Sequence, residues 1–80
     1  MGNRQATLIY NPHAGIRQSH DAVPHFLAFW QLYGWEIQLA PTQYAGHAAE
    51  LARAAAERGD ALVFAAGGDG TLNEVANGLA

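Results

Sequence analysis

The feature that most constrains this chain is the glycine-rich stretch Gly67–Thr71, together with what flanks it. An apolar run, Asp60–Ala66, comes directly before it. After it, apolar residues recur at the spacing of a helix, at Leu72, Val75, Ala76 and Leu79. A glycine turn between a buried strand and a helix offers bare backbone amides, and the positive end of the helix dipole, to an anion. The stretch therefore predicts a phosphate-binding loop.

The same residues are compatible with a second interpretation, since Asp-Gly between apolar runs is also typical of a β-hairpin. A hairpin needs an alternating strand after the turn, and the helical spacing that follows Thr71 does not provide one. Thr71 and Glu74 also have the spacing of a capping box, which marks the first turn of a helix. We therefore favour the order strand, glycine loop, helix, with Glu74 as the partner of a helix cap.

Two similar units precede this one. The first has a strand at Ala6–Tyr10, ended by Asn11-Pro12, and a helix that we expect to begin near Asp21, with Pro24 in its first turn, and to end at Gly34. Its expected buried stripe is Val23, Phe26, Leu27, Trp30 and Tyr33.

The second unit has a strand at Glu36–Ala40, stopped by Pro41, and the loop Thr42–Gly46. A helix follows at His47–Arg58, closed by Gly59. Its expected packing face is Ala48, Leu51, Ala52, Ala55 and Ala56.

The alternation of strands and helices predicts an α/β fold, a three-layer βαβαβα Rossmann-like parallel sheet with right-handed connections. The third strand is the most apolar, so we expect it to be covered on both faces and to lie beside the first strand. The last helix reaches Ala80 without a terminating residue beyond Gly78, and three strands leave open edges, so we expect a fragment of a larger domain. A second apolar track on the first helix, Ala22, Phe29 and Leu32, would face another domain or another copy of the chain, and we expect the fragment to form a homo-oligomer.

Composition excludes several classes of function. A net charge of −3 argues against a nucleic-acid platform, and the absence of lysine excludes a Walker-type loop. The chain has no cysteine, and its histidines have no companions at ligand spacing, so no metal site is expected among these residues. No stretch is apolar enough to span a membrane, so we expect a soluble cytoplasmic protein, with peripheral membrane contact left open.

In a parallel sheet, ligands collect at the carboxyl ends of the strands. The three loops that follow the expected strands are 11–15, 42–46 and 67–71, and each contains glycine and a small polar side chain. We expect them to lie on one edge of the sheet, around a cleft that can take a nucleotide across its phosphates and sugar.

Four blocks carry a family resemblance: Asn11-Pro12-x-Ala14-Gly15, Thr42 with Gly46-His47-Ala48 and Glu50-Leu51-Ala52, Gly67-Gly68-Asp69-Gly70-Thr71-Leu72-Asn73-Glu74-Val75, and Asn77-Gly78-Leu79. With these blocks the chain resembles the N-terminal nucleotide-binding part of the diacylglycerol kinase catalytic domain family, which includes bacterial lipid kinases and sphingosine kinases. The resemblance implies that residues 1–80 are a nucleotide-binding subdomain that lacks the C-terminal domain, and that this part alone is inactive.

The resemblance implies transfer of the terminal phosphate of ATP to a lipid hydroxyl, with magnesium as cofactor. Asp69 would be the catalytic candidate, near the magnesium–water network or the reacting hydroxyl, and the magnesium ligands would lie mostly in the missing part. Relatives often carry lysine where this chain has Ile16-Arg17, and Arg17 could replace that charge. The implied nucleotide-binding residues are Asn11, Pro12, His13, Ala14, Gly15, Arg17, Thr42, Gly67, Gly68, Asp69, Gly70, Thr71, Leu72 and Asn73.

Two other interpretations remain open. Nicotinamide-dinucleotide kinases and phosphofructokinases share a Gly-Gly-Asp-Gly loop, although the Asn-Pro-x-Ala-Gly block and the Asn-Glu-Val tail favour the lipid class. The chain could also be a folding or assembly unit without chemistry of its own.

Overall fold

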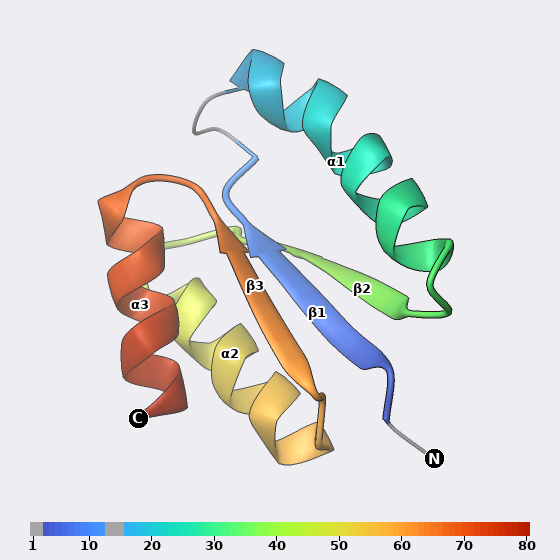
Figure 1. Ribbon diagram of the computed structural model, residues 1–80. Helices are drawn as coiled ribbons and strands as arrows, with labels where there is room; N and C mark the ends of the chain where they lie inside the picture. The colour runs from blue at the N-terminus through green and yellow to red at the C-terminus, as the bar shows by residue number, and fades with distance from the viewer. Residues whose placement is uncertain (1–2, 13–15) are drawn as a thin grey trace.

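The computed structural model describes residues 3–12 and 16–80, with side chains described at 3–12 and 23–80 (Figure 1). Strands and helices alternate through the described residues, which confirms the predicted α/β class. The elements are β1 (Gln5–Tyr10), α1 (Ile16–Gln31), β2 (Glu36–Pro41), α2 (His47–Arg58), β3 (Leu62–Ala66) and α3 (Asp69–Leu79).

The three strands form one parallel sheet in the order β2-β1-β3. The prediction that β3 lies beside β1 is confirmed, but the expectation that β3 is covered like a central strand is wrong for the described residues. Leu62 in β3 is 37% exposed, whereas four consecutive residues of β1 are buried. The pattern of apolar residues did not indicate that β1 is the more buried strand, because β1 contains the polar residue Thr7. Thr7 is only 2% exposed, and its hydroxyl has polar partners.

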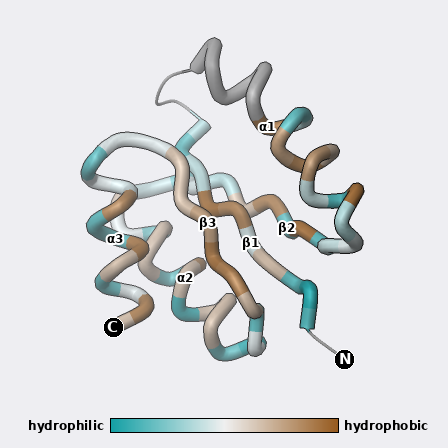
Figure 2. Tube along the Cα trace, viewed as in Figure 1, coloured by the Kyte–Doolittle hydropathy of each residue, from teal (hydrophilic) through white to brown (hydrophobic). Residues whose placement is uncertain are grey.

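Helices cover both faces of the sheet, α1 on one and the pair α2 and α3 on the other (Figure 1). Figure 2 shows hydrophobic residues along the strands between these layers. On the α1 face, Phe64 packs against Phe26 and Trp30, with ring centroids 4.9 and 5.0 Å apart. On the other face the buried cluster is Ile9, Ala48, Ala52 and Val75, with Ala40, Leu51, Val63 and Ala65 packed against it. The three-layer architecture is therefore confirmed.

The first helix is longer than predicted. It begins at Ile16 instead of near Asp21, so Pro24 lies in its interior and not in its first turn. No glycine or proline separates Ile16 from Val23, and one proline removes only one intrahelical hydrogen bond. The helix ends at Gln31, and a turn with Gly34 at φ 82° follows.

The apolar stripe of α1 is narrower than expected. Val23, Phe26, Leu27 and Trp30 are half-buried, but Tyr33 lies beyond the helix and is 59% exposed. On the second apolar track, Phe29 and Leu32 are exposed, and Ala22 falls outside the described side chains. Self-association through this track stays a prediction.

The bounds of α2 are those predicted, with Gly46 and Gly59 at its ends, both at positive φ. Ala48, Ala52 and Ala55 are buried, whereas the predicted Ala56 is exposed because it lies about 100° around the helix from Ala55. These small residues let α3 approach closely. A Cβ on Gly78 would lie 2.3 Å from the carbonyl oxygen of Ala49.

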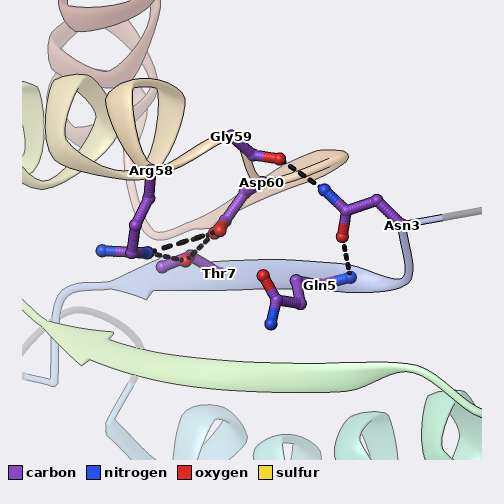
Figure 3. Close-up of polar contacts among 6 residues, drawn as sticks. All are labelled: Asn3, Gln5, Thr7, Arg58, Gly59 and Asp60. Atoms are coloured by element: carbon purple, nitrogen blue, oxygen red, sulfur yellow. Dashed lines mark hydrogen bonds and ion pairs between the residues drawn. The ribbon is translucent and has the colours of Figure 1, made fainter.

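A polar network fixes the end of α2 and the start of β3 to the central strand, at the edge of the sheet where the strands begin (Figure 3). The Thr7 hydroxyl donates to the Asp60 carboxylate and accepts from the Arg58 guanidinium at 2.7 Å. Arg58 also lies 3.1 Å from Asp60 in an ion pair. Burial alone would raise the pKa of Asp60, but the hydrogen bonds from Thr7 and Arg58 and the charge of Arg58 outweigh it and lower that pKa.

Candidate functional site

The carboxyl ends of all three strands meet at one edge of the sheet (Figure 1). Tyr10 lies opposite Pro41 on one side and Ala66 on the other. The backbone N–H of Asn11 donates to the carbonyl of Ala66 at 3.3 Å, and that of Thr42 donates to the carbonyl of Tyr10 at 2.8 Å. The three loops therefore start side by side, as the parallel order predicted.

We call this edge of the sheet, where the three strands end, the rim. From the rim, the chain continues in different directions after β1 and after β3. β1 continues to α1 on one face of the sheet, and its neighbour β3 continues to α3 on the opposite face (Figure 1). Adjacent strands whose connections diverge in this way form a topological switch point, where open α/β sheets have their ligand crevice.

A pocket of about 240 Å³ opens at this rim. Asn11, Thr42 and Thr71, each from a different loop and each predicted as a site residue, all line it. The lining residues are Asn11, Thr42, Gln43, Tyr44, Ala45, Thr71 and Glu74. Six of the seven are uncharged, so the walls suit a neutral polar group better than a phosphate.

The other predicted site residues lie beside this pocket or outside the description. Six of them form the exposed turn from β3 into α3 and its first residues: Gly67, Gly68, Asp69, Gly70, Leu72 and Asn73. Pro12 follows Asn11 and is half-buried. His13, Ala14 and Gly15, and the side chain of Arg17, lie outside the described residues.

The start of α3 has the form that an anion site requires. The cap residue is Gly68, at φ −82° and ψ −176°, and no side chain of residues 3–12 and 23–80 hydrogen-bonds this end of the helix. At Gly67, with φ 149°, a Cβ would lie 2.9 Å from the hydroxyl oxygen of Thr71, so this position excludes larger residues. Gly68 and Gly70 have open space where a Cβ would stand, which leaves the backbone approachable.

The predicted capping box is wrong. Thr71 lies inside α3 instead of at its cap, and is buried at 9% exposure. The reason is that the helix begins two residues earlier than Thr71, at Asp69, with a glycine in the cap position.

Glu74 is the partner of a helix cap, but of another helix. Its carboxylate accepts a hydrogen bond from the backbone N–H of Gly46 at 3.2 Å and from that of Ala48 at 3.3 Å. Both amides belong to the start of α2. Sequence reasoning missed Glu74 as a pocket residue, and no local pattern signals a contact between residues 26 and 28 positions apart.

Two side chains of α2, His47 and Glu50, also hold the Thr42–Gly46 loop. The backbone N–H of Gln43 donates to Nδ1 of His47 at 3.0 Å. The ring of Tyr44 stacks on His47 with centroids 4.3 Å apart and an interplanar angle of 15°. The Tyr44 hydroxyl donates to Glu50 at 2.8 Å, and this hydrogen bond raises the pKa of Tyr44 above its usual 10.0.

Within residues 3–12 and 23–80, no three histidine, cysteine or acidic side chains gather into a metal-ligand group. Asp69 is exposed in the first turn of α3. In the part of the chain that the structure covers, none of the helices has the length and hydrophobicity to cross a bilayer.

The strand order, the helices on both faces and the switch point define a doubly wound α/β unit. The sequence model of the diacylglycerol kinase catalytic domain matches residues 5–80, and the chain belongs to this family. The predicted resemblance is thereby confirmed.

Relatives and solved structures agree with this assignment. The chain is 42% identical over 77 residues to a diacylglycerol kinase of Bacillus subtilis and 44% identical over 78 residues to one of Staphylococcus aureus, with 96% of the chain covered in both. A crystal structure assigned as a diacylglycerol kinase of Bacillus anthracis superposes on 99% of the chain with a TM-score of 0.78 at 28% identity. The chain spans about a quarter of each relative, from 24% to 27% of its length.

Proposed function

We propose that this chain is the ATP-binding part of a lipid kinase that transfers the terminal phosphate of ATP to a lipid hydroxyl such as that of diacylglycerol. The proposal rests on two features that meet at one switch point: a pocket lined by six uncharged residues and Glu74, and a helix start that no described side chain caps. A nucleotide has both a neutral and an anionic end, and the rim offers a place for each.

The triphosphate would lie along Gly67–Gly70. The first amides of a helix have no intrahelical partners, and the helix dipole adds positive potential at this end. Because no described side chain caps α3, its first amides are suited to phosphate oxygens. Phosphoryl transfer depends mainly on positioning and charge stabilisation, and backbone donors fixed at a helix start supply both.

The nucleoside would occupy the pocket lined by Asn11, Thr42 and Tyr44. The Thr42 hydroxyl and the Asn11 amide are groups that can hydrogen-bond a ribose or a base. Tyr44 is 54% exposed, and its ring is held in place by His47 and Glu50. We propose that the Tyr44 ring forms one wall for the base.

Magnesium would enter with ATP. Asp69 is the one carboxylate in the first turn of α3, which places it beside the proposed phosphate position. We assign it a role toward the magnesium–water shell or the reacting hydroxyl. Further magnesium ligands and a general base would come from the three quarters of the relatives' length that this chain does not span. On this basis we propose that the chain alone binds nucleotide and does not transfer phosphate. We also propose that the complete kinase is cytoplasmic and binds its lipid substrate at a membrane surface.

Two measurements test the proposal. Calorimetric titration of magnesium–ATP into this chain should show saturable binding, and absence of binding would favour an inert folding unit. Labelled ATP with the full-length protein should then phosphorylate diacylglycerol or a sphingoid base. Phosphate incorporated only into nicotinamide dinucleotide would contradict the lipid assignment.

A further inference from the structure

We propose that Glu74 is a positioning residue for the nucleotide, which sets the placement of the Thr42–Gly46 loop relative to the start of α3. The inference rests on the proposed function, since it assigns a role within the same site. Glu74 itself need not touch the nucleotide.

The contacts of Glu74 join two segments that are far apart in the sequence. One carboxylate oxygen accepts from Gly46 and the other from Ala48, so the two oxygens together hold the first turn of α2. The amides at a helix start have no intrahelical partners, and a carboxylate there is favoured by the dipole. Each bond therefore stabilises the end of the loop that also contains Thr42.

The residues that follow Glu74 in α3 pack closely against α2. The next residue, Val75, is 5% exposed and packs with Ala48 and Ala52 in the core. One turn later, Gly78 lies against the backbone of Ala49. Glu74 thus makes its hydrogen bonds where α2 and α3 pack closely together. In this way it fixes the position of Thr42 relative to Thr71 across the pocket.

Glu74 also determines which helix start is left for phosphate. It places a negative charge on the amides of α2, whereas no side chain of residues 3–12 and 23–80 hydrogen-bonds the first amides of α3. Among the residues that line the pocket, Glu74 is the only charged one. The arrangement keeps phosphate away from α2 and directs it to the neighbouring turn at Gly68.

The test separates positioning from simple charge effects, because the two predict opposite changes in the affinity for magnesium–ATP when Glu74 is replaced. Removing a negative charge beside an anionic ligand should strengthen binding if only Coulomb forces mattered. If Glu74 positions the loop, Glu74→Gln should instead weaken magnesium–ATP binding by about tenfold, the equivalent of one hydrogen bond to a charged group. Glu74→Asp keeps the charge but shortens the reach, and should weaken binding as well.

The control is Glu57→Gln, which removes the same charge at an exposed position near the far end of α2 and should leave the affinity within about twofold. Affinities are measured by calorimetry below the melting temperature of every variant, with the amide resonances of Gly46 and Ala48 followed by NMR. A merely structural role would lower the melting temperature without changing the affinity of the folded protein.

The possible outcomes are distinct. Weaker binding in both Glu74 variants, with shifted Gly46 and Ala48 resonances, supports the inference. Wild-type binding with unchanged or tighter binding in Glu74→Gln overturns this inference alone. A wild-type protein that does not bind magnesium–ATP overturns the proposed function, and the inference with it.

Discussion

Gly68→Asp should stabilise the protein and abolish nucleotide binding at once. Gly68 has φ −82° and ψ −176°, a region open to any residue, and a Cβ there meets nothing within 4 Å. The fold therefore accepts the side chain without displacement. Aspartate is also a preferred cap residue, and its carboxylate can accept from the amides of Gly70 and Thr71.

The expected gain in stability has three sources. A better cap is worth a few tenths of a kcal/mol, the favourable dipole about 0.3–1 kcal/mol, and the reduced freedom of the unfolded chain about 0.4–1 kcal/mol. Together they give about 1–2 kcal/mol, and in a domain of this size each kcal/mol raises the melting temperature by about 4–8 °C.

The expected loss of binding is larger. Two like unit charges about 4 Å apart near a protein surface repel by about 4 kcal/mol, and the new carboxylate also occupies the amides that phosphate would use. Salt and water reduce this figure, so we expect magnesium–ATP affinity to fall at least about hundredfold. Calorimetry measures the affinity, and thermal unfolding followed by circular dichroism measures the stability.

Two controls separate charge from bulk. Gly68→Ala adds a side chain without charge and should weaken binding much less than Gly68→Asp. Asn77→Asp adds the same charge at an exposed position of α3, nine residues on and about 13 Å along the axis, and should leave affinity nearly unchanged. Unaltered affinity in Gly68→Asp would refute the assignment of phosphate to this turn.

Two further changes test the packing. Gly78→Ala should destabilise the fold by about 1–3 kcal/mol in urea denaturation, although alanine is normally the better helix residue, because its Cβ would lie 2.3 Å from the Ala49 carbonyl oxygen. The control is Asn77→Ala, at the exposed residue before Gly78, which should change stability by no more than about 0.5 kcal/mol. A Gly78→Ala protein more stable than the wild type would contradict the close approach of Gly78 to the backbone of Ala49. Asp60→Asn tests the lowered pKa of Asp60. The ionised carboxylate contributes its full stabilisation at pH values above the pKa of Asp60 in the unfolded chain, near 3.8. This stabilisation is lost as the pH falls through the lower pKa of Asp60 in the folded protein. The difference in unfolding free energy from wild type should thus be constant near neutral pH and shrink below about pH 4, and a difference that does not vary with pH would count against the network.

The sequence predicted best what local chemistry determines. The bounds of α2 were predicted because glycine stands at both ends, where the backbone has positive φ. The common rim of the three loops follows from the parallel order of the strands, because parallel strands end at the same edge.

The sequence predicted less well what depends on distant partners. Thr7 made β1 look less buried than β3, although Asp60 and Arg58, more than fifty residues away, satisfy its hydroxyl. Pro24 suggested a late start for α1, but the helix retains an interior proline. Glu74 was expected at a cap of its own helix and caps α2 instead, because the docking of α3 on α2 brings it there.

The most direct test of the nucleotide site is an NMR titration of isotope-labelled protein with magnesium–ATP. We predict that the amides of Asn11, Thr42, Gly68 and Gly70 shift together and saturate at one concentration, because they surround one ligand at the rim. Shifts confined to the opposite edge of the sheet, around Gln5, Glu36 and Asp60, or no shifts at saturating ATP, would contradict the account.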